Sequence, residues 1–473
     1  MNAIKTDICV IGAGAGGLSV AAGAVQMGAD VVLIEKSMMG GDCLNYGCVP
    51  SKSLLSAAHI MDTLKNADKL GIHVNNYSVD YQEVHNHIHN VIKTIAPKDS
   101  IERFEKLGVK VIKGEASFKN SKEVIVGDKV VHAKYFVIAT GSKPIVLPIK
   151  GLESVNYLTN ETIFDLKEIP EHLVVIGGGP IGCELSQGLR LLGAKVTIIQ
   201  RSRILAKDDQ ELTNVVYDKF IEDGLEVYEN TNIDSIENID GKIIVNFEHK
   251  GKVAKVAGSH LLLSVGRKPN IDRLNLNAAG IEYSSRGIHI NSRLRTSNKK
   301  IFALGDAALG YKFTHMAGYQ AGIIIRNILF RIPAKVNYNA VPWVTYTEPE
   351  LAHVGMHEDE ALKKFKDAKI LKLPFSDNDR AQSELKTKGM IKVITNKNGL
   401  ILGASIVGSN AGDLIGTWCL AISQKLKIGS VAGCIIPYPT RGEINKQVAG
   451  SFYTPMLYSD KTRKIVKFIM KWF

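Results

Sequence analysis

Short runs of consecutive apolar residues, each followed by a cluster of glycines, recur along this chain. The first run covers residues 8–11, and a comparable run covers residues 173–176. A segment that is apolar at every position is typical of a parallel strand buried on both faces. Each run leads into a glycine turn, then a segment with helical character, then a second apolar run. The pattern therefore predicts two strand–turn–helix–strand units in one chain.

The two glycine turns are copies of one motif. Each has three glycines at the GxGxxG spacing, which lets backbone approach a pyrophosphate at a helix N-terminus. The first copy is followed by Glu35, whose carboxylate suits the ribose hydroxyls of an adenosine. We therefore expect two dinucleotide sites. The glycines of the two copies are Gly12, Gly14 and Gly17, and then Gly177, Gly179 and Gly182.

The residue that ends each unit predicts which dinucleotide it binds. Gln200 occupies, in the second copy, the place of Glu35 in the first, and Arg201 and Arg203 follow it, with Lys207 close by. Glutamine removes the charge that would repel a 2′-phosphate, and arginines supply donors for one. We predict an unphosphorylated dinucleotide at the first site and NADPH, rather than NADH, at the second.

The remaining pattern completes the predicted architecture. A helical stretch is expected over residues 51–107, buried strands over 261–265 and 301–304, and alternating strands with two helices beyond residue 340. The predicted fold class is α/β, with two Rossmann-like nucleotide-binding domains and a third, α+β domain at the C-terminus. We place the domain boundaries near residues 150, 270 and 339.

Composition narrows the function class. The chain has 45% apolar and 22% charged residues, which excludes a largely disordered chain and a polytopic membrane protein. The net charge of +12 is spread along the sequence without a nucleic-acid-binding motif, so anionic cofactors explain it better than nucleic acid does. Six scattered cysteines, no leader pattern and no long apolar stretch predict a reducing cytoplasm.

Cys43 and Cys48 form the most informative pair. Four residues separate them, which does not match the two-residue spacing of a metal knuckle, and no second pair completes a zinc site. A redox disulfide fits better, because Cys48 precedes a predicted helix whose N-terminus would stabilise a thiolate. From spacing alone, a structural or incidental pair remains an alternative. No resident metal is predicted.

Around these cysteines the chain resembles the pyridine nucleotide-disulfide oxidoreductases, the group that contains dihydrolipoyl dehydrogenase, glutathione reductase and mercuric reductase. Residues 40–52 are similar to the family motif GGTCxNxGCxPSK, with Asp42 where threonine is usual. Residues 139–142 resemble its ATGS segment, residues 296–306 its second FAD motif, and residues 348–355 the opening of its dimerisation domain.

The resemblance implies that residues 1–150 are the first part of an FAD-binding domain, 151–270 an NAD(P)-binding domain, 271–339 a second FAD-binding or central part, and 340–473 a C-terminal α+β dimerisation domain. It also implies a homodimeric enzyme that passes electrons from NAD(P)H through FAD to a Cys43–Cys48 disulfide. Cys48 would lie against the flavin, and Cys43 would attack a disulfide or related acceptor. Lys52 and Glu184 match an ion pair beside the flavin. The other cofactor-binding positions implied by the family pattern are Lys36, Gly41, Thr140, Gly141, Ser142, Gly266, Arg267, Gly305 and Asp306.

The pattern breaks at the acid–base dyad that thiol-reducing members take from the partner subunit. Glu443 is in place, but Tyr438 stands where histidine is usual, and no histidine follows His357. Tyrosine, with an ordinary pKa near 10, is a poor base near neutral pH. Mercuric reductases are similar in having tyrosine here, which makes a soft metal ion the alternative acceptor. Those enzymes also have a cysteine pair near the C-terminus, whereas here no cysteine follows Cys434.

Two further patterns are weighed. His85, His87 and His89 are more typical of a solvated helix surface than of a metal site, because no Cys or acidic cluster accompanies them. Residues 461–473 form a basic amphipathic pattern that either packs at the dimer interface, which we favour, or makes weak contact with a membrane. Contact with a membrane would favour a different class of function, a membrane- or partner-docking flavoprotein whose disulfide is regulatory.

Overall fold

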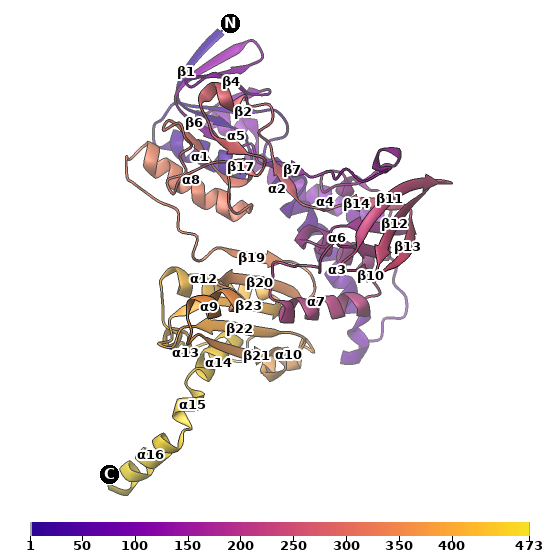
Figure 1. Ribbon diagram of the computed structural model, residues 1–473, viewed down its shortest axis with the longest axis vertical. Helices are drawn as coiled ribbons and strands as arrows, with labels where there is room; N and C mark the ends of the chain where they lie inside the picture. The colour runs from indigo at the N-terminus through magenta and orange to yellow at the C-terminus, as the bar shows by residue number, and fades with distance from the viewer. Residues whose placement is uncertain (1, 473) are drawn as a thin grey trace. The chain divides into compact units, whose positions relative to one another are not determined.

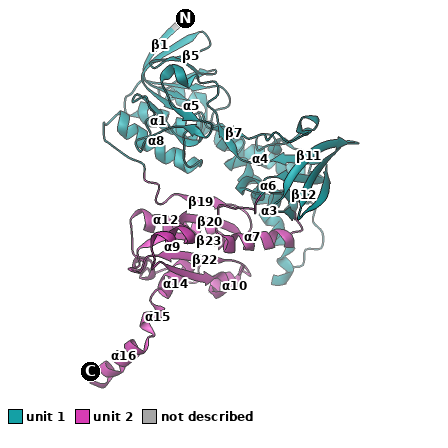
Figure 2. Cartoon of the chain, viewed as in Figure 1, with its two compact units in different colours: residues 1–201, 227–336 teal, residues 202–226, 337–473 magenta. Residues whose placement is uncertain are grey.

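The computed structural model describes residues 2–472, which divide into two compact units (Figure 2). Unit 1 comprises residues 1–201 and 227–336, and unit 2 comprises residues 202–226 and 337–473. No helix among the described residues is long and apolar enough to cross a membrane.

Unit 1 is built on a mixed sheet whose central strands are parallel. The strand order is β3-β2-β1-β6-β5-β4, with β18 pairing with β6. The continuous apolar run of β1 is buried on both faces, as the pattern predicted. These strands are β1 (Asn2–Ile11), β2 (Val31–Glu35), β3 (Lys110–Lys113), β4 (Ser117–Asn120), β5 (Glu123–Val126), β6 (Lys129–Ile138) and β18 (Ile301–Ala303).

A second parallel sheet in unit 1 repeats the first on a smaller scale. Its order is β10-β9-β8-β14, from β8 (His172–Ile176), β9 (Lys195–Ile199), β10 (Glu226–Tyr228) and β14 (His260–Leu263). An antiparallel sheet packs beside it, from β11 (Asn232–Ile239), β12 (Lys242–His249) and β13 (Lys252–Gly258). Smaller ladders join β7 (Ser142–Pro144) to β15 (Arg267–Pro269), and β16 (Tyr283–Ser284) to β17 (Gly287–Ile288).

The helices of unit 1 pack on these sheets or on one another. Helices α1 and α8 lie together against the apolar side chains of β1, β2 and β6 (Figure 1). The helices are α1 (Ala15–Gln26), α2 (Gly41–Asn45), α3 (Cys48–Lys65), α4 (Tyr81–Ile95), α5 (Ile101–Lys106), α6 (Pro180–Leu191) and α8 (Thr314–Ile328). The helical stretch expected over 51–107 is thus three helices, because an extended, largely exposed segment separates α3 from α4.

Unit 2 is an antiparallel sheet covered by short helices. The order is β19-β20-β23-β22-β21, from β19 (Pro342–Thr345), β20 (Glu350–Gly355), β21 (Lys369–Pro374), β22 (Met390–Thr395) and β23 (Ile401–Gly408). The helices are α7 (Gln210–Glu222), α9 (Glu358–Lys364), α10 (Asp379–Ser383), α11 (Ala411–Leu414), α12 (Gly416–Ser423), α13 (Ile428–Ala432), α14 (Glu443–Ser451), α15 (Thr454–Leu457) and α16 (Asp460–Trp472).

The α/β fold class with two Rossmann-like folds and an antiparallel dimerisation sheet is confirmed. The expectation of two helices beyond residue 340 was wrong, because the helical segments there are broken into short pieces. Gly433, for example, ends α13. The division into domains at 150, 270 and 339 stays a prediction.

Buried Lys392 explains why residues 202–226 belong to unit 2. Its ammonium group, 3% exposed, lies 2.5 Å from Asp209 Oδ2 and 2.8 Å from both Glu211 Oε2 and Glu358 Oε2. Asp209 and Glu211 flank the start of α7, whereas Lys392 lies on β22. Burial alone would lower the pKa of Lys392, but its hydrogen bonds to these carboxylates together raise it, so the lysine stays charged and holds α7 on the sheet.

Replacing Lys392 by methionine should therefore destabilise unit 2. Removing one partner from a buried ion cluster leaves uncompensated charge, which costs about 3–5 kcal/mol. The control is Lys388→Met, since Lys388 pairs with Glu222 where both side chains are more than half exposed; such pairs contribute about 1 kcal/mol or less. Urea unfolding followed by tryptophan fluorescence reports on unit 2, because Trp343, Trp418 and Trp472 all lie there. Equal losses in both variants would contradict this role.

Candidate active site

Both glycine turns form open cradles at the N-terminus of a helix. Gly17 has no room for a side chain, because a Cβ atom would lie 1.8 Å from the Gly12 carbonyl oxygen. Gly14 has room, with the nearest atom at 3.9 Å, and Gly179 has nothing within 4 Å. No acidic residue lies in the first turn of α1 or α6. A pyrophosphate therefore fits at both helix starts.

Glu35 and Gln200 occupy equivalent places, as the repeat predicted. The backbone N–H of Ala13 donates to Glu35 Oε2 at 2.6 Å, and that of Gly178 donates to Gln200 Oε1 at 2.7 Å. Glu35 also accepts from the backbone N–H of Ser37 at 2.7 Å. Each side chain is thus fixed beside its glycine turn, with a carboxylate in the first copy and a neutral amide in the second.

The segments expected to hold FAD carry an unsatisfied polar group. The Thr140 hydroxyl is buried and has no hydrogen-bond partner among residues 2–472. Nearby, Ser142 Oγ donates to Asp306 Oδ2 at 2.5 Å. Burial raises the pKa of Asp306, with the Ser142 hydrogen bond opposing the shift. An open glycine cradle, an unpartnered hydroxyl and a half-buried acid together fit a bound dinucleotide such as FAD.

Of the three cationic side chains that follow Gln200, Arg203 is held by hydrogen bonds, whereas Arg201 and Lys207 are exposed. Arg203 donates to Thr213 Oγ1 at 2.7 Å and to the Asp208 carbonyl at 2.6 Å, all within unit 2. Its guanidinium therefore has a structural role that the sequence did not reveal.

Cys43 and Cys48 lie on two consecutive helices of unit 1. Cys43 lies within α2, whereas Cys48 is the first residue of α3, directly after its N-cap Gly47. Both are free thiols in the structure, and the Cys48 sulfur lies 3.5 Å from the Thr314 hydroxyl. The position of Cys48 at the start of an eighteen-residue helix favours its anionic form.

The two thiols are unequal. A hydrogen bond from Cys43, with smaller contributions from Thr314 and the charge of Lys52, lowers the pKa of Cys48 to about 6 against the effect of burial. The same hydrogen bond, followed by burial, raises the pKa of Cys43. At neutral pH the reduced pair is therefore a Cys48 thiolate that accepts a hydrogen bond from a Cys43 thiol.

Lys52 and Glu184 form the ion pair that the family pattern implied. Lys52 Nζ lies 2.7 Å from Glu184 Oε2, and the Glu184 side chain is 7% exposed. Lys52 lies one turn beyond Cys48 on α3, and Glu184 lies on α6. The two helices approach closely at Gly188, where an added Cβ would lie 3.2 Å from Leu55.

Asp42 joins a polar network that the sequence did not predict. Arg267 donates to Asp42 Oδ1 at 2.8 Å and to Asn160 Oδ1 at 3.0 Å, and Asn160 in turn donates to Asp42 at 3.1 Å. Arg267 also donates to Ser142 Oγ at 2.8 Å. The arginine therefore ties the segment before Cys43 to the segment that carries Ser142.

Tyr438 and Glu443 lie in unit 2. The Tyr438 hydroxyl donates to Asp379 Oδ2 at 3.0 Å, and this hydrogen bond and the charge of Asp379 raise the pKa of the exposed tyrosine. Tyr438 therefore stays protonated at neutral pH and is a hydrogen-bond donor rather than a base. Glu443 is the half-buried first residue of α14.

The remaining predicted residues lie as follows. Lys36 is exposed and pairs with Glu115 at 3.4 Å. Among the predicted site glycines, the backbone dihedral φ is positive at Gly12 (+105°), Gly41 (+62°), Gly141 (+68°), Gly177 (+110°), Gly266 (+117°) and Gly305 (+59°). Sequence reasoning missed Asn160, Thr314 and Asp379, because each takes part through a contact distant along the chain.

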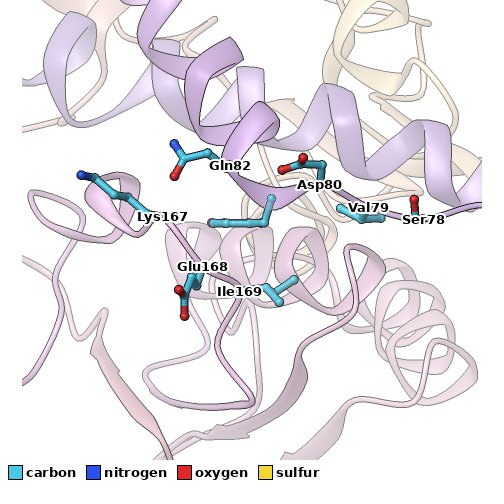
Figure 3. A pocket seen from close by; sticks show the side chains of 8 residues that line it. Ser78, Val79, Asp80, Gln82, Lys167, Glu168 and Ile169 are labelled. Carbon is cyan, nitrogen blue, oxygen red and sulfur yellow. The ribbon is translucent and has the colours of Figure 1, made fainter.

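Two surface cavities lie elsewhere in unit 1. The first, of about 610 Å³, lies at the start of α4 and includes Asp80, Gln82 and Lys167 (Figure 3). The second, of about 470 Å³, includes His85 and His89, whose rings lie 4.3 Å apart. Neither contains a cysteine or a glycine-turn residue, and no cluster of three or more potential metal ligands exists within residues 2–472.

Comparison with known proteins agrees with this geometry. Residues 6–321 match the family model "Pyridine nucleotide-disulphide oxidoreductase", and residues 341–449 match the dimerisation domain of that family. A dihydrolipoyl dehydrogenase from Bacillus subtilis (strain 168) is 38% identical, covering 94% of this chain and 96% of its own. A mercuric reductase from Bacillus cereus is 37% identical, covering 92% of this chain and 70% of its own.

Among solved structures, the Cu(II) complex of the HOCl-induced flavoprotein disulfide reductase RclA from Escherichia coli is similar. It has a TM-score of 0.86 and 26% sequence identity, and the match covers 95% of this chain and all of the other.

Gly14→Ala should weaken cofactor binding, whereas Gly17→Ala should destabilise the fold. Gly14→Ala leaves the fold intact, because its Cβ has room, but it fills the pyrophosphate approach and should weaken FAD binding by about ten-fold or more. Gly17→Ala should lower the melting temperature of the apoprotein, because its Cβ overlaps the Gly12 carbonyl oxygen. Calorimetry of apoprotein and FAD titration separate the two, and unchanged FAD affinity in Gly14→Ala would contradict the cradle.

The Cys48 thiolate should appear as the pH rises through about 6 and be lost below it, because its pKa is lowered to about 6. Ultraviolet thiolate absorbance of the reduced protein measures this transition. Thr314→Val removes one hydrogen bond to Cys48 and should raise the midpoint by roughly one pH unit or less. Thr314→Ser keeps the hydroxyl and should leave the midpoint at its wild-type value. A wild-type midpoint near the ordinary thiol pKa of about 8.5 would refute the assignment.

Proposed function

The chain belongs to the pyridine nucleotide-disulphide oxidoreductase family, and we propose that it passes electrons from NADPH, through bound FAD, to Cys43 and Cys48 and from them to an external acceptor. The observation that carries this proposal is the unequal thiol pair, with Cys43 on α2 and Cys48 at the start of α3, one turn before Lys52 of the Lys52–Glu184 ion pair. FAD, when bound, would carry two electrons from the nicotinamide to the cysteines.

The preferred acceptor is a disulfide or a related group. Cys43 attacks one sulfur of the acceptor disulfide and a mixed disulfide forms. The bond between the acceptor sulfurs breaks, and the Cys43 proton passes to the departing sulfur, which leaves as the first acceptor thiol. Cys48 thiolate then attacks Cys43 Sγ, which releases the second acceptor thiol and closes the Cys43–Cys48 disulfide. Overall, NADPH, one proton and the acceptor disulfide give NADP⁺ and two thiols, so the electrons balance.

A soft metal ion is the second candidate acceptor. The observation in its favour is Tyr438, whose raised pKa and hydrogen bond to Asp379 make it a poor base. Two sulfur ligands bind such an ion well, and its reduction needs no acid–base dyad for thiol protons. Here NADPH and a divalent ion give NADP⁺, the reduced metal and one proton. The similarity to mercuric reductases and to a Cu(II)-bound reductase supports this second candidate.

We assign a homodimer on the match of residues 341–449 to the dimerisation domain. In it, Tyr438 of the partner subunit and Glu443 of the partner subunit would line the acceptor site. The neutral Gln200 beside the second cradle and the exposed Arg201 support NADPH over NADH. The sparse cysteines support a reducing cytoplasm.

Parallel turnover assays test the proposal. The FAD-loaded protein is supplied with NADPH or NADH and with lipoamide, glutathione disulfide or Hg(II), without oxygen. Cys43→Ser should lower turnover of every productive acceptor on the order of a thousand-fold or more. Ferricyanide, which takes electrons from the flavin directly, should react equally with both proteins. Unchanged turnover of the acceptors in Cys43→Ser would refute the disulfide route.

Tyr438→His distinguishes the acceptor classes. Restoring a group that titrates near neutral pH should raise disulfide turnover roughly a hundred-fold, since general acid–base catalysis supplies about that factor. Hg(II) turnover should not change. Tyr438→Phe is the matched control, because it removes the hydroxyl without adding a base. Fast disulfide turnover in the wild type, unaffected by Tyr438→His, would show that another group performs the proton transfer.

A further inference from the structure

Helix α16 exposes large apolar side chains to solvent. Phe468 is 63% exposed, Trp472 66% and Ile469 47%. The preceding α15 and its C-cap also expose large apolar groups, with Leu457 52% and Tyr458 68% exposed. In Figure 1 the helix lies clear of the sheet of unit 2, next to α15.

The helix has two faces of different chemistry. Ile465, Phe468, Ile469 and Trp472 follow the i, i+3, i+4, i+7 spacing that places side chains on one face. The rings of Phe468 and Trp472 lie 6.3 Å apart, which confirms that these two share a face. The opposite face carries Arg463, Lys467 and Lys471 at intervals of four, with Lys464 beside them.

This division determines what can cover the helix. The helix combines an apolar strip that contains two aromatic side chains with a row of cations, and its one acidic residue is Asp460 at the first position. This combination matches the boundary between acyl chains and anionic headgroups in a membrane. A polyanion such as a nucleic acid would use the cations but leave the apolar strip in water. The match to the dimerisation domain ends at residue 449, before α16 begins, so the family pattern does not assign this helix to the subunit interface.

We infer that α16 docks the protein on membranes that contain anionic phospholipid. The helix lies along the membrane surface, with Phe468, Ile469 and Trp472 among the upper acyl chains and the cationic row at the headgroups. This role is separate from the proposed electron transfer, to which no residue of α16 is assigned. The favoured alternative from sequence, packing at the dimer interface, becomes an outcome of the test.

Flotation of the FAD-loaded full chain measures the docking. Vesicles of phosphatidylcholine and phosphatidylglycerol in equal parts are compared with vesicles of phosphatidylcholine alone. The protein should float with the anionic vesicles and be released by raised salt, because salt screens the cation contribution. Lys464→Gln/Lys467→Gln/Lys471→Gln should weaken binding on the order of a hundred-fold, and Phe468→Ser/Ile469→Ser should abolish flotation.

A matched control exists elsewhere on the surface. Lys250→Gln/Lys252→Gln/Lys255→Gln removes the same charge from exposed positions around the β12–β13 hairpin, and Val253→Ser removes a side chain that is 87% exposed. Both controls should float as the wild type does. Ferricyanide reduction should be unchanged in all variants, which shows that each is folded and loaded with FAD.

Three outcomes would overturn the inference. The first is no flotation of the wild type with anionic vesicles. The second is loss of flotation in the lysine variant but not in the Phe468/Ile469 variant, because that pattern indicates a site for polyanions rather than for a membrane. The third is dissociation of the dimer by Phe468→Ser/Ile469→Ser in sedimentation without vesicles, because the occupant of the apolar face is then a second copy of the chain.

Discussion

The ion pair between Lys52 and Glu184 joins the helix that begins at a redox cysteine to the first helix of the second nucleotide fold. The Glu184 carboxylate is almost fully buried, so removal of Lys52 would leave a buried charge without its ion-pair partner. The lysine also contributes its charge to the Cys48 thiolate. One contact therefore links the packing of α3 on α6 to the charge beside the Cys48 thiolate.

The sequence predicted those parts of the site that are local or repeated. The equivalence of Glu35 and Gln200 follows from spacing alone, and in the structure each accepts from the backbone N–H directly after the first glycine of its turn. The cysteine pair and its helix were also predictable, because helix starts are set by neighbouring residues. The fold class followed from the apolar runs, which alternate with helices in the order that parallel sheets require.

Contacts between distant segments escaped prediction. The Arg267 guanidinium contacts Asp42, Asn160 and Ser142, residues far apart in the chain, and its place at a cofactor stays a prediction. Arg203, whose role at a phosphate also stays a prediction, donates to Thr213 and to the Asp208 carbonyl. The pattern of polar and apolar residues does not predict such contacts, because the five N–H donors of an arginine bind whichever acceptors the fold brings near them.

The unequal thiols have a consequence for the acidity of the solution during turnover. The proton that Cys43 retains goes to product when the acceptor is a disulfide, and each cycle then also draws one proton from water. When the acceptor is a metal ion, the same proton has no destination in the product and is released. A weakly buffered reaction therefore turns alkaline in the first case and acidic in the second, so that a pH electrode alone distinguishes two chemistries performed by one pair of sulfur atoms.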